Sequence, residues 1–266
     1  MQNGETKTMD TEEQKILVCE DSDVGILTGI YEAYERKVDH NTTYLQVGEE
    51  ENMRLFSSYI EIIPSKLKAE KVIRTIERRF GRETLQIILE ALGSTDREKG
   101  QAVYQMIVFG LKGEYKGKLI DCLSCDAVVK VVALSTTVWH EYHHLYGFVR
   151  FQELENGILY AVIHPKNHVL VFLGDHFSNR FPKEHFMIYD EVHGICLIHG
   201  AHKKWFIVDA GLLELDQLPE VSAKELQIQK LFRYFCQKIS ITERENLSLQ
   251  QQMLPLRFRP DMVEFQ

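Results

Sequence analysis

Residues 148–163 read FVRFQELENGILYAVI, and the pattern of the chain changes there. Two apolar runs, 148–154 and 158–163, flank Glu155-Asn156-Gly157, and Asn-Gly between such runs is a strong β-hairpin signal. Before this stretch, apolar residues recur mostly at helical spacing; after it, they fall mainly in short runs typical of strands. The sequence therefore predicts an α+β fold, in which a largely helical N-terminal half packs on a mainly antiparallel sheet with a crossing helix.

Capping signals and apolar spacing give the expected elements on either side of this hairpin. The expected helices cover Asp21 or Ser22 to about Val38, 66–80, 83–92, a segment opened by a capping box at 95–98, 126–146, 168–180, and a segment opened by a second capping box at 222–225. The expected later strands cover 185–190, 195–199 and 204–210. A short apolar run at 16–19 could join the same sheet, so we expect a flexible tail at 1–14 and one domain over 15–266.

Composition limits the class of protein. The chain has 266 residues and a formal net charge of −8, which disfavours attraction to nucleic acid over its whole surface but leaves room for a local basic strip. No apolar run is long enough to span a membrane, and the polar N-terminus is not a secretory signal. Five cysteines, an odd number, predict reduced thiols and a cytoplasmic protein.

Residues 140–144, HEYHH, fit the H-E-x-x-H signature of zinc hydrolases. The longer form of that signature places its third ligand at position 150, where this chain has Arg150, and a guanidinium cannot bind a metal. Cys122 and Cys125 precede His140 and His144 at finger-like spacing, but a helix over 126–146 would hold them about 20 Å or more apart. A zinc hydrolase using His140, Glu141 and His144 is an alternative; otherwise we expect no metal and no cofactor.

Six separated motifs carry a resemblance to a known family. They are YEAYERK (31–37), EYHHLYGFVRF (141–151), YAVIHPKNHVL (160–170), HFSNRF (176–181), MIYDEVHG (187–194) and MLPLRFRPDMVEF (253–265). Over about residues 16–266 the chain resembles the family of probable DNA metabolism proteins, a family of unknown function. The resemblance implies a role in DNA repair or modification beside a radical-SAM protein, and similar regions are sometimes fused to a uracil-DNA glycosylase-like domain. His140 lies outside the family's pattern, which makes the zinc-like match accidental.

The matched motifs supply the candidate site residues. Arg150 lies in an apolar segment and needs a partner: either an ion pair, with Glu141 or Asp190, or a bound phosphate. His176 and Arg180 are four residues apart and would share one helix face. We take Arg150, His176 and Arg180 as a phosphate-binding or nucleic-acid-binding set. Glu141, His144 and Asp190 are the candidate acid–base groups.

A second basic feature occupies residues 66–82, where Lys71, Arg74 and Arg78 would form one stripe on a helix. Such a stripe is either a solvated helix face or a contact for phosphates. The sequence thus predicts a nucleic-acid-binding or accessory factor of DNA repair, with DNA and a radical-SAM protein as partners. The alternatives are the zinc hydrolase and a non-enzymatic interaction scaffold.

Overall fold

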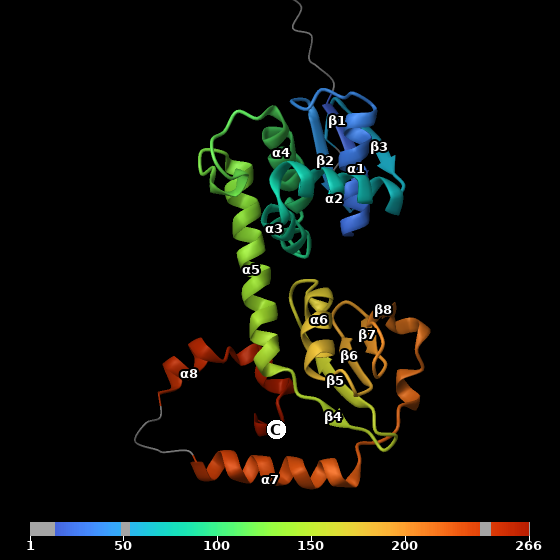
Figure 1. Cartoon of the computed structure of the whole chain (residues 1–266), viewed down its shortest axis with the longest axis vertical. Helices are drawn as coiled ribbons and strands as arrows, with labels where there is room; N and C mark the ends of the chain where they lie inside the picture. The colour runs from blue at the N-terminus through green and yellow to red at the C-terminus, as the bar shows by residue number, and fades with distance from the viewer. Residues whose placement is uncertain (1–13, 49–53, 240–245, 266) are drawn as a thin grey trace, which may run out of the picture. The chain divides into compact units, whose positions relative to one another are not determined.

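The computed structural model describes residues 14–48, 54–239 and 246–265 (Figure 1). The chain divides into two compact units, Met1–Thr137 and Val138–Gln266, whereas the sequence led us to expect one domain over 15–266. Helix α5 (Asp126–Phe148) contributes residues to both. Each unit combines helices with its own sheet, so the predicted α+β class is confirmed. None of the described helices is both long and apolar enough to cross a membrane.

The first unit contains a parallel sheet that the sequence reading missed. Its strands are β1 (Gln14–Cys19), β2 (Thr43–Val47) and β3 (Ser57–Ile62), in the order β2-β1-β3. The expectation that residues 16–19 join the later sheet is wrong, because β1 pairs with β2 and β3. The predicted cap at Ser22 is confirmed: its Oγ accepts the backbone N–H of Gly25 at 3.0 Å and opens α1 (Asp23–Glu35).

Four further helical elements complete this unit, together with the first residues of α5. They are α2 (Lys66–Phe80), α3 (Arg82–Leu92), α4 (Lys99–Lys112) and the short η1 (Leu119–Asp121). Helix α4 begins one residue after the 95–98 capping box rather than within it. Ile26, Ile30, Ile76 and Met106 are buried where these helices and the sheet meet, which gives the unit its own core.

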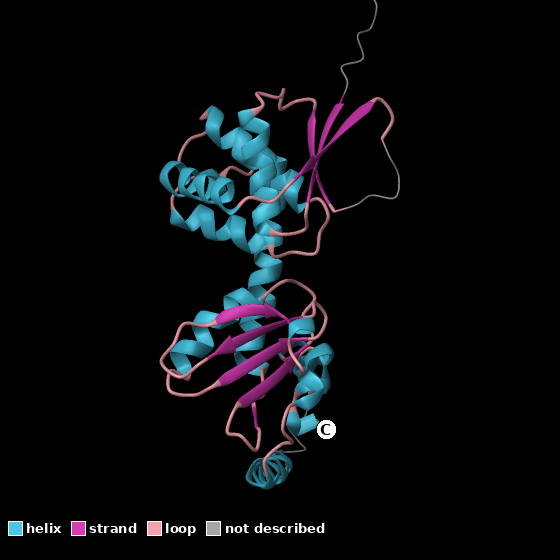
Figure 2. Cartoon of the chain, turned by 90° about the vertical axis from the view of Figure 1, so that its right-hand side faces the viewer, coloured by secondary structure: helices cyan, strands magenta, loops and turns pink. Residues whose placement is uncertain are grey.

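The second unit is built on a five-stranded sheet, visible as a row of arrows in Figure 2. Its strands are β4 (Gln152–Glu153), β5 (Leu159–Ile163), β6 (Phe186–Asp190), β7 (Ile195–His199) and β8 (Phe206–Asp209), in that spatial order. The predicted hairpin is confirmed, with β4 and β5 antiparallel across a turn in which Gly157 has a φ of +80°. Strands β5 and β6 run parallel, joined by α6 (Leu170–Arg180), and the remaining pairs are antiparallel.

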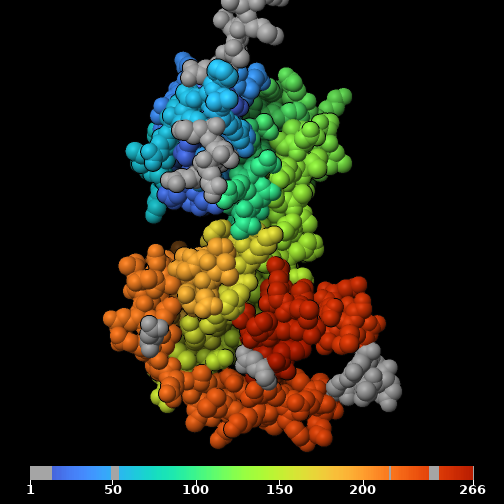
Figure 3. Space-filling view, turned by 180° about the vertical axis from the view of Figure 1, so that it is seen from behind, coloured from blue at the N-terminus to red at the C-terminus, as the bar shows by residue number. Residues whose placement is uncertain are grey.

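Further helical elements follow the sheet: η2 (Ala210–Leu212), η3 (Leu215–Gln217), α7 (Ala223–Ile239), α8 (Leu247–Met253), η5 (Leu256–Asp261) and η6 (Val263–Phe265). The predicted cap at Ser222 is confirmed, because its Oγ accepts the N–H of Glu225 at 3.1 Å. Residues 255–265, called the C-terminal segment below, belong to the red surface of this unit in Figure 3. Phe258 of this segment is buried in the core with residues of α5 and α6.

Candidate functional site

Glu141 is a buried carboxylate whose oxygens are both occupied. Its side chain is only 1% exposed on α5. Oε1 accepts the backbone N–H of Lys166 at 2.8 Å and pairs with Arg257 at 3.0 Å. Oε2 accepts the backbone N–H of Asn167 at 2.9 Å and its side-chain amide at 2.6 Å. This arrangement satisfies an ionised carboxylate without solvent, so Glu141 holds the loop after β5 rather than serving as a free acid or base.

Arg150 forms an ion pair, as one of the two predicted outcomes requires, but its partner is Glu264 rather than Glu141 or Asp190. Nη2 donates to Oε1 at 2.7 Å and Nε to Oε2 at 3.2 Å, which is the bidentate geometry of a strong arginine–carboxylate pair. Nη1 donates to the carbonyl of Gly147 at 2.7 Å. A phosphate could bind this guanidinium only by displacing Glu264.

Three pairs of charged side chains hold the C-terminal segment against the rest of the second unit. They join Arg257 to Glu141, Glu264 to Arg150, and Asp261 to Nδ1 of His164 at 2.9 Å. A cavity of about 160 Å³ lies beside this third pair, with Arg150 and Asp261 among its lining residues. Residues 253–265, MLPLRFRPDMVEF, thus contribute one charged partner to each of these three pairs.

His164 is held between two carboxylates, since its Nε2 also contacts Glu191. Burial works to lower the pKa of His164, but the hydrogen bonds to Asp261 and Glu191 outweigh it and raise that pKa above its ordinary value of 6.5. His164 was not among the predicted site residues. It sits directly after β5, where a parallel strand pair brings loops to one edge.

Asp190 ends β6 at that same edge and is fully buried. It accepts the backbone N–H of His193 at 3.1 Å and contacts Nδ1 of the same residue at 2.7 Å. The ring of His168, from the loop after β5, lies 3.9 Å from the ring of His193. A carboxylate that accepts from Nδ1 orients the histidine ring and, in a neutral ring, makes Nε2 the acceptor nitrogen. The structure therefore joins the predicted Asp190 to two histidines that the sequence did not nominate.

The other predicted residues lie in aromatic surroundings. His144 packs against Phe148 and Phe258, with ring centroids 5.6 and 5.7 Å away. Burial, and after it the Arg257 guanidinium, lower the pKa of His144. His176 stacks on Tyr146 at 3.9 Å, and burial followed by the charge of Arg180 lowers the pKa of His176. Both histidines are therefore favoured in the neutral form, which weakens their attraction to phosphate.

Arg180 follows His176 by four residues on α6, as predicted, and its guanidinium lies 5.7 Å from the ring centroid of Phe181. Within the described ranges, the hydrogen bonds of Arg150 involve neither His176 nor Arg180. Arg150 is thus not hydrogen-bonded to the other two members of the predicted phosphate-binding set among the described residues, whereas the charge of Arg180 acts on His176.

The metal-binding alternative has no ligand set in the part of the chain that the structure describes. No group of three or more His, Cys, Asp or Glu side chains is arranged there to hold a metal ion. Glu141, the central residue of the zinc-like motif, is directed to Asn167 and Arg257 instead. All five cysteines are free thiols. Burial raises the pKa of Cys19 to about 12, which makes it unreactive.

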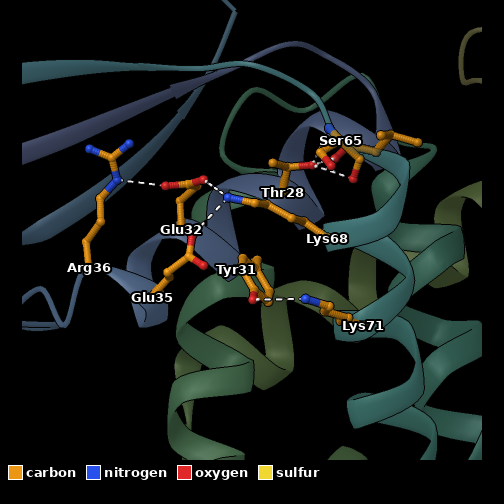
Figure 4. A network of polar contacts seen from close by, with 9 residues as sticks. Thr28, Tyr31, Glu32, Glu35, Arg36, Ser65, Lys68 and Lys71 are labelled. Atoms are coloured by element: carbon orange, nitrogen blue, oxygen red, sulfur yellow. Dashed lines mark hydrogen bonds and ion pairs between the residues drawn. The ribbon is translucent and has the colours of Figure 1, made fainter.

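The basic side chains of residues 66–82 fall into two groups: those with an acidic partner and those without one among the described residues. Arg74 pairs with Glu70 at 3.1 Å, Arg82 pairs with Glu77 at 2.8 Å, and Lys68 reaches α1. Four exposed cations in this stretch have no acidic partner among the described residues: Lys66, Lys71, Arg78 and Arg79. Instead, Lys71 points to Tyr31, with Nζ 3.3 Å from the phenol oxygen (Figure 4). We call Lys71, Arg78 and Arg79 the α2 strip.

Comparison with known proteins places the chain in a family without an assigned activity. The chain belongs to the family described as domain of unknown function DUF4130, whose sequence model matches residues 97–264. No curated protein matches the chain. The family match includes every candidate residue of the second unit, from Glu141 to Glu264, and it excludes α2.

Proposed function

We propose that the protein is a nucleic-acid-binding factor of DNA metabolism that contacts the phosphate backbone through the α2 strip. The supporting observation is that three exposed cations on one helix have no acidic partner among the residues that the structure describes, although the chain carries a net charge of −8 and pairs the neighbouring Arg74 and Arg82 with glutamates. Unpaired arginine and lysine side chains on an otherwise acidic protein make a local site for phosphate.

The strip has the dimensions of a short backbone contact. Lys71 and Arg78 are seven residues apart on α2, which corresponds to about 10 Å along the helix axis. Three phosphate contacts to a single strand would give a slope of about −2 when log K is plotted against log salt concentration. That slope distinguishes backbone binding from a contact made by apolar groups alone.

The chemistry of this proposed role would come from a partner. The family resemblance implies a radical-SAM protein, and we propose that such a protein carries out the reaction on DNA while this chain binds the strand. The engagement of Glu141 and Arg150 in structural pairs supports the assignment of an accessory role to this chain. Pull-down of the radical-SAM protein by the full chain, with and without DNA, tests this part.

Fluorescence anisotropy with a labelled single-stranded oligonucleotide over a salt series tests the binding itself. The test variant replaces Lys71, Arg78 and Arg79 with glutamine. The control replaces Lys66, Lys116 and Lys203 with glutamine, three exposed lysines outside the strip, so that both variants lose the same charge. We expect the test variant to lose most of the affinity and of the salt slope, and the control to keep both. Equal losses in the two variants would reject the α2 strip as the binding site.

A further inference from the structure

An apolar pocket lies directly beside the α2 strip, between α1, α2 and α4. Its volume is about 240 Å³, and its walls include Tyr31, Tyr34, Lys71, Thr75, Phe80 and Ile107. A cavity of about 150 Å³ already accepts a benzene ring. The pocket therefore has room for one aromatic ring system, such as a nucleobase.

The cations of α2 are placed around this pocket by helix geometry. Lys71 lines it, and its Nζ lies 5.0 Å from the ring centroid of Tyr31. Arg79 follows the lining residue Thr75 by four positions and Arg78 follows Lys71 by seven, so both project from the same side of the helix as these lining residues. Lys66, at the start of α2, does not line the pocket. An occupant that fits has flat apolar faces and carries negative charge next to them.

The walls of the pocket are held in place by polar contacts between α1 and α2 (Figure 4). Lys68 of α2 binds Glu35 of α1 at 2.9 Å and also contacts Glu32. Thr28 accepts the backbone N–H of Ser65 at 3.0 Å and donates to its carbonyl at 3.2 Å. A pocket that is already formed binds its ligand without a large ordering cost.

The polar groups in the walls allow a base to be oriented. Burial raises the pKa of Tyr34 to about 12, so its hydroxyl remains a hydrogen-bond donor. Tyr31 is a half-buried aromatic ring with Nζ of Lys68 and of Lys71 at 5.2 and 5.0 Å from its centroid, and base–aromatic stacking tolerates any base because every base has a π-face. Aromatic platforms beside a basic groove are the usual means of binding single strands.

We propose that one unpaired base of a single-stranded nucleic acid enters this pocket and stacks on Tyr31, while the flanking phosphates bind the α2 strip. This inference rests on the proposed function and extends it, because it specifies single strands over duplexes. A duplex keeps its bases stacked inside and offers only its backbone to the strip.

The test compares single-stranded and duplex oligonucleotides of one sequence, with 2-aminopurine as the fluorescent base in the single strand. We expect the full-length protein to prefer the single strand and to change the 2-aminopurine emission. Tyr31→Ala should weaken single-strand binding by about 5- to 150-fold, the range expected for one stacked base. Tyr31→Phe should retain it, because the ring is kept. Tyr115→Ala removes a half-buried tyrosine of the same unit outside the pocket and serves as the control.

A second variant keeps the test decisive if Tyr31→Ala alters the fold. Thr75→Leu fills the pocket and removes only a hydrogen bond from the Thr75 hydroxyl to the carbonyl of Lys71, four residues earlier. It should lower single-strand affinity without changing the salt slope. If Tyr31→Ala and Thr75→Leu both bind like the unmodified protein while the strip variant does not, the pocket inference is overturned and the proposed function stands. Preference for the duplex also overturns the pocket inference, and absence of binding to either oligonucleotide overturns both proposals.

Discussion

Replacement of Glu141 by glutamine provides a quantitative test of the role assigned to this residue. In the native protein Oε1 of Glu141 accepts one hydrogen bond, from the backbone of Lys166, and forms an ion pair with Arg257, while Oε2 accepts two hydrogen bonds from Asn167. Glutamine keeps one oxygen and directs an NH₂ group at the other pair of donors. The less costly orientation places the NH₂ group toward Arg257, because that side chain is 45% exposed and water can solvate it.

The backbone N–H of Lys166, in a part-buried hydrogen bond, then loses its acceptor, which costs up to about 1–3 kcal/mol, and loss of the negative charge weakens the bonds to Asn167. We therefore expect Glu141→Gln to lower the free energy of unfolding by about 2–4 kcal/mol, within the range known for broken buried polar pairs. Urea denaturation of the full chain, followed by a probe of the second unit, measures this change.

Glu155→Gln is the matched control, because Glu155 is exposed in the hairpin turn of the same unit. Its expected effect is within about 0.5 kcal/mol, as for most surface substitutions. A Glu141→Gln protein as stable as this control would refute the reasoning, and the buried carboxylate would then have to be assigned a role other than holding the loop.

Three further predictions concern the same unit. Arg150→Met should destabilise the protein by about 1–3 kcal/mol, less than the 3–5 of a fully buried pair, and should increase proteolytic cleavage within 255–265; unchanged cleavage contradicts the role given to the C-terminal segment. Folding raises the pKa of His164. Its ion pairs therefore add fully to the free energy of unfolding below the pKa of the unfolded chain, about 6.5, and this stabilisation is lost as the pH rises through the folded pKa. The stability difference between the native protein and His164→Gln should shrink between about pH 5 and 8, and a difference that grows with pH would contradict this. Gly174→Ala should lower the free energy of unfolding by about 1–3 kcal/mol, because the new Cβ would lie 2.4 Å from the ring of Trp205. The new Cβ of Gly147→Ala meets no atom within 4 Å, so this variant should stabilise helix α5 by up to about 1 kcal/mol. Thermal unfolding measures both variants, and equal shifts of the unfolding temperature would contradict this prediction.

Local signals in the sequence predicted the elements that depend on local interactions. The hairpin follows from Asn156-Gly157, and two helix starts follow from Ser22 and Ser222, because a turn or a cap needs only neighbouring residues. The parallel pairing of β5 with β6 and of β1 with β2 was missed, since it joins strands separated by a helix and leaves no signal at either strand.

The candidate site shows the same limit. Asp190 and Glu141, which the sequence nominates as candidate acid–base groups, are both buried. Their partners lie elsewhere in the chain: Glu141 binds residues 25 and 26 positions later, and Arg150 binds Glu264, 114 positions later. The spacing of residues in the sequence cannot reveal such pairs.

Helix α7 was predicted from its apolar periodicity, yet Ile228 and Phe235 are exposed while Gln229 is buried.

The central claim is that the α2 strip binds the phosphate backbone of nucleic acid. The most direct measurement is the salt dependence of single-strand binding by the full chain, with Lys71, Arg78 and Arg79 intact or replaced by glutamine. The account predicts a slope of about −2 for the intact protein and a slope near zero for the variant. A slope that is the same in both proteins would contradict it.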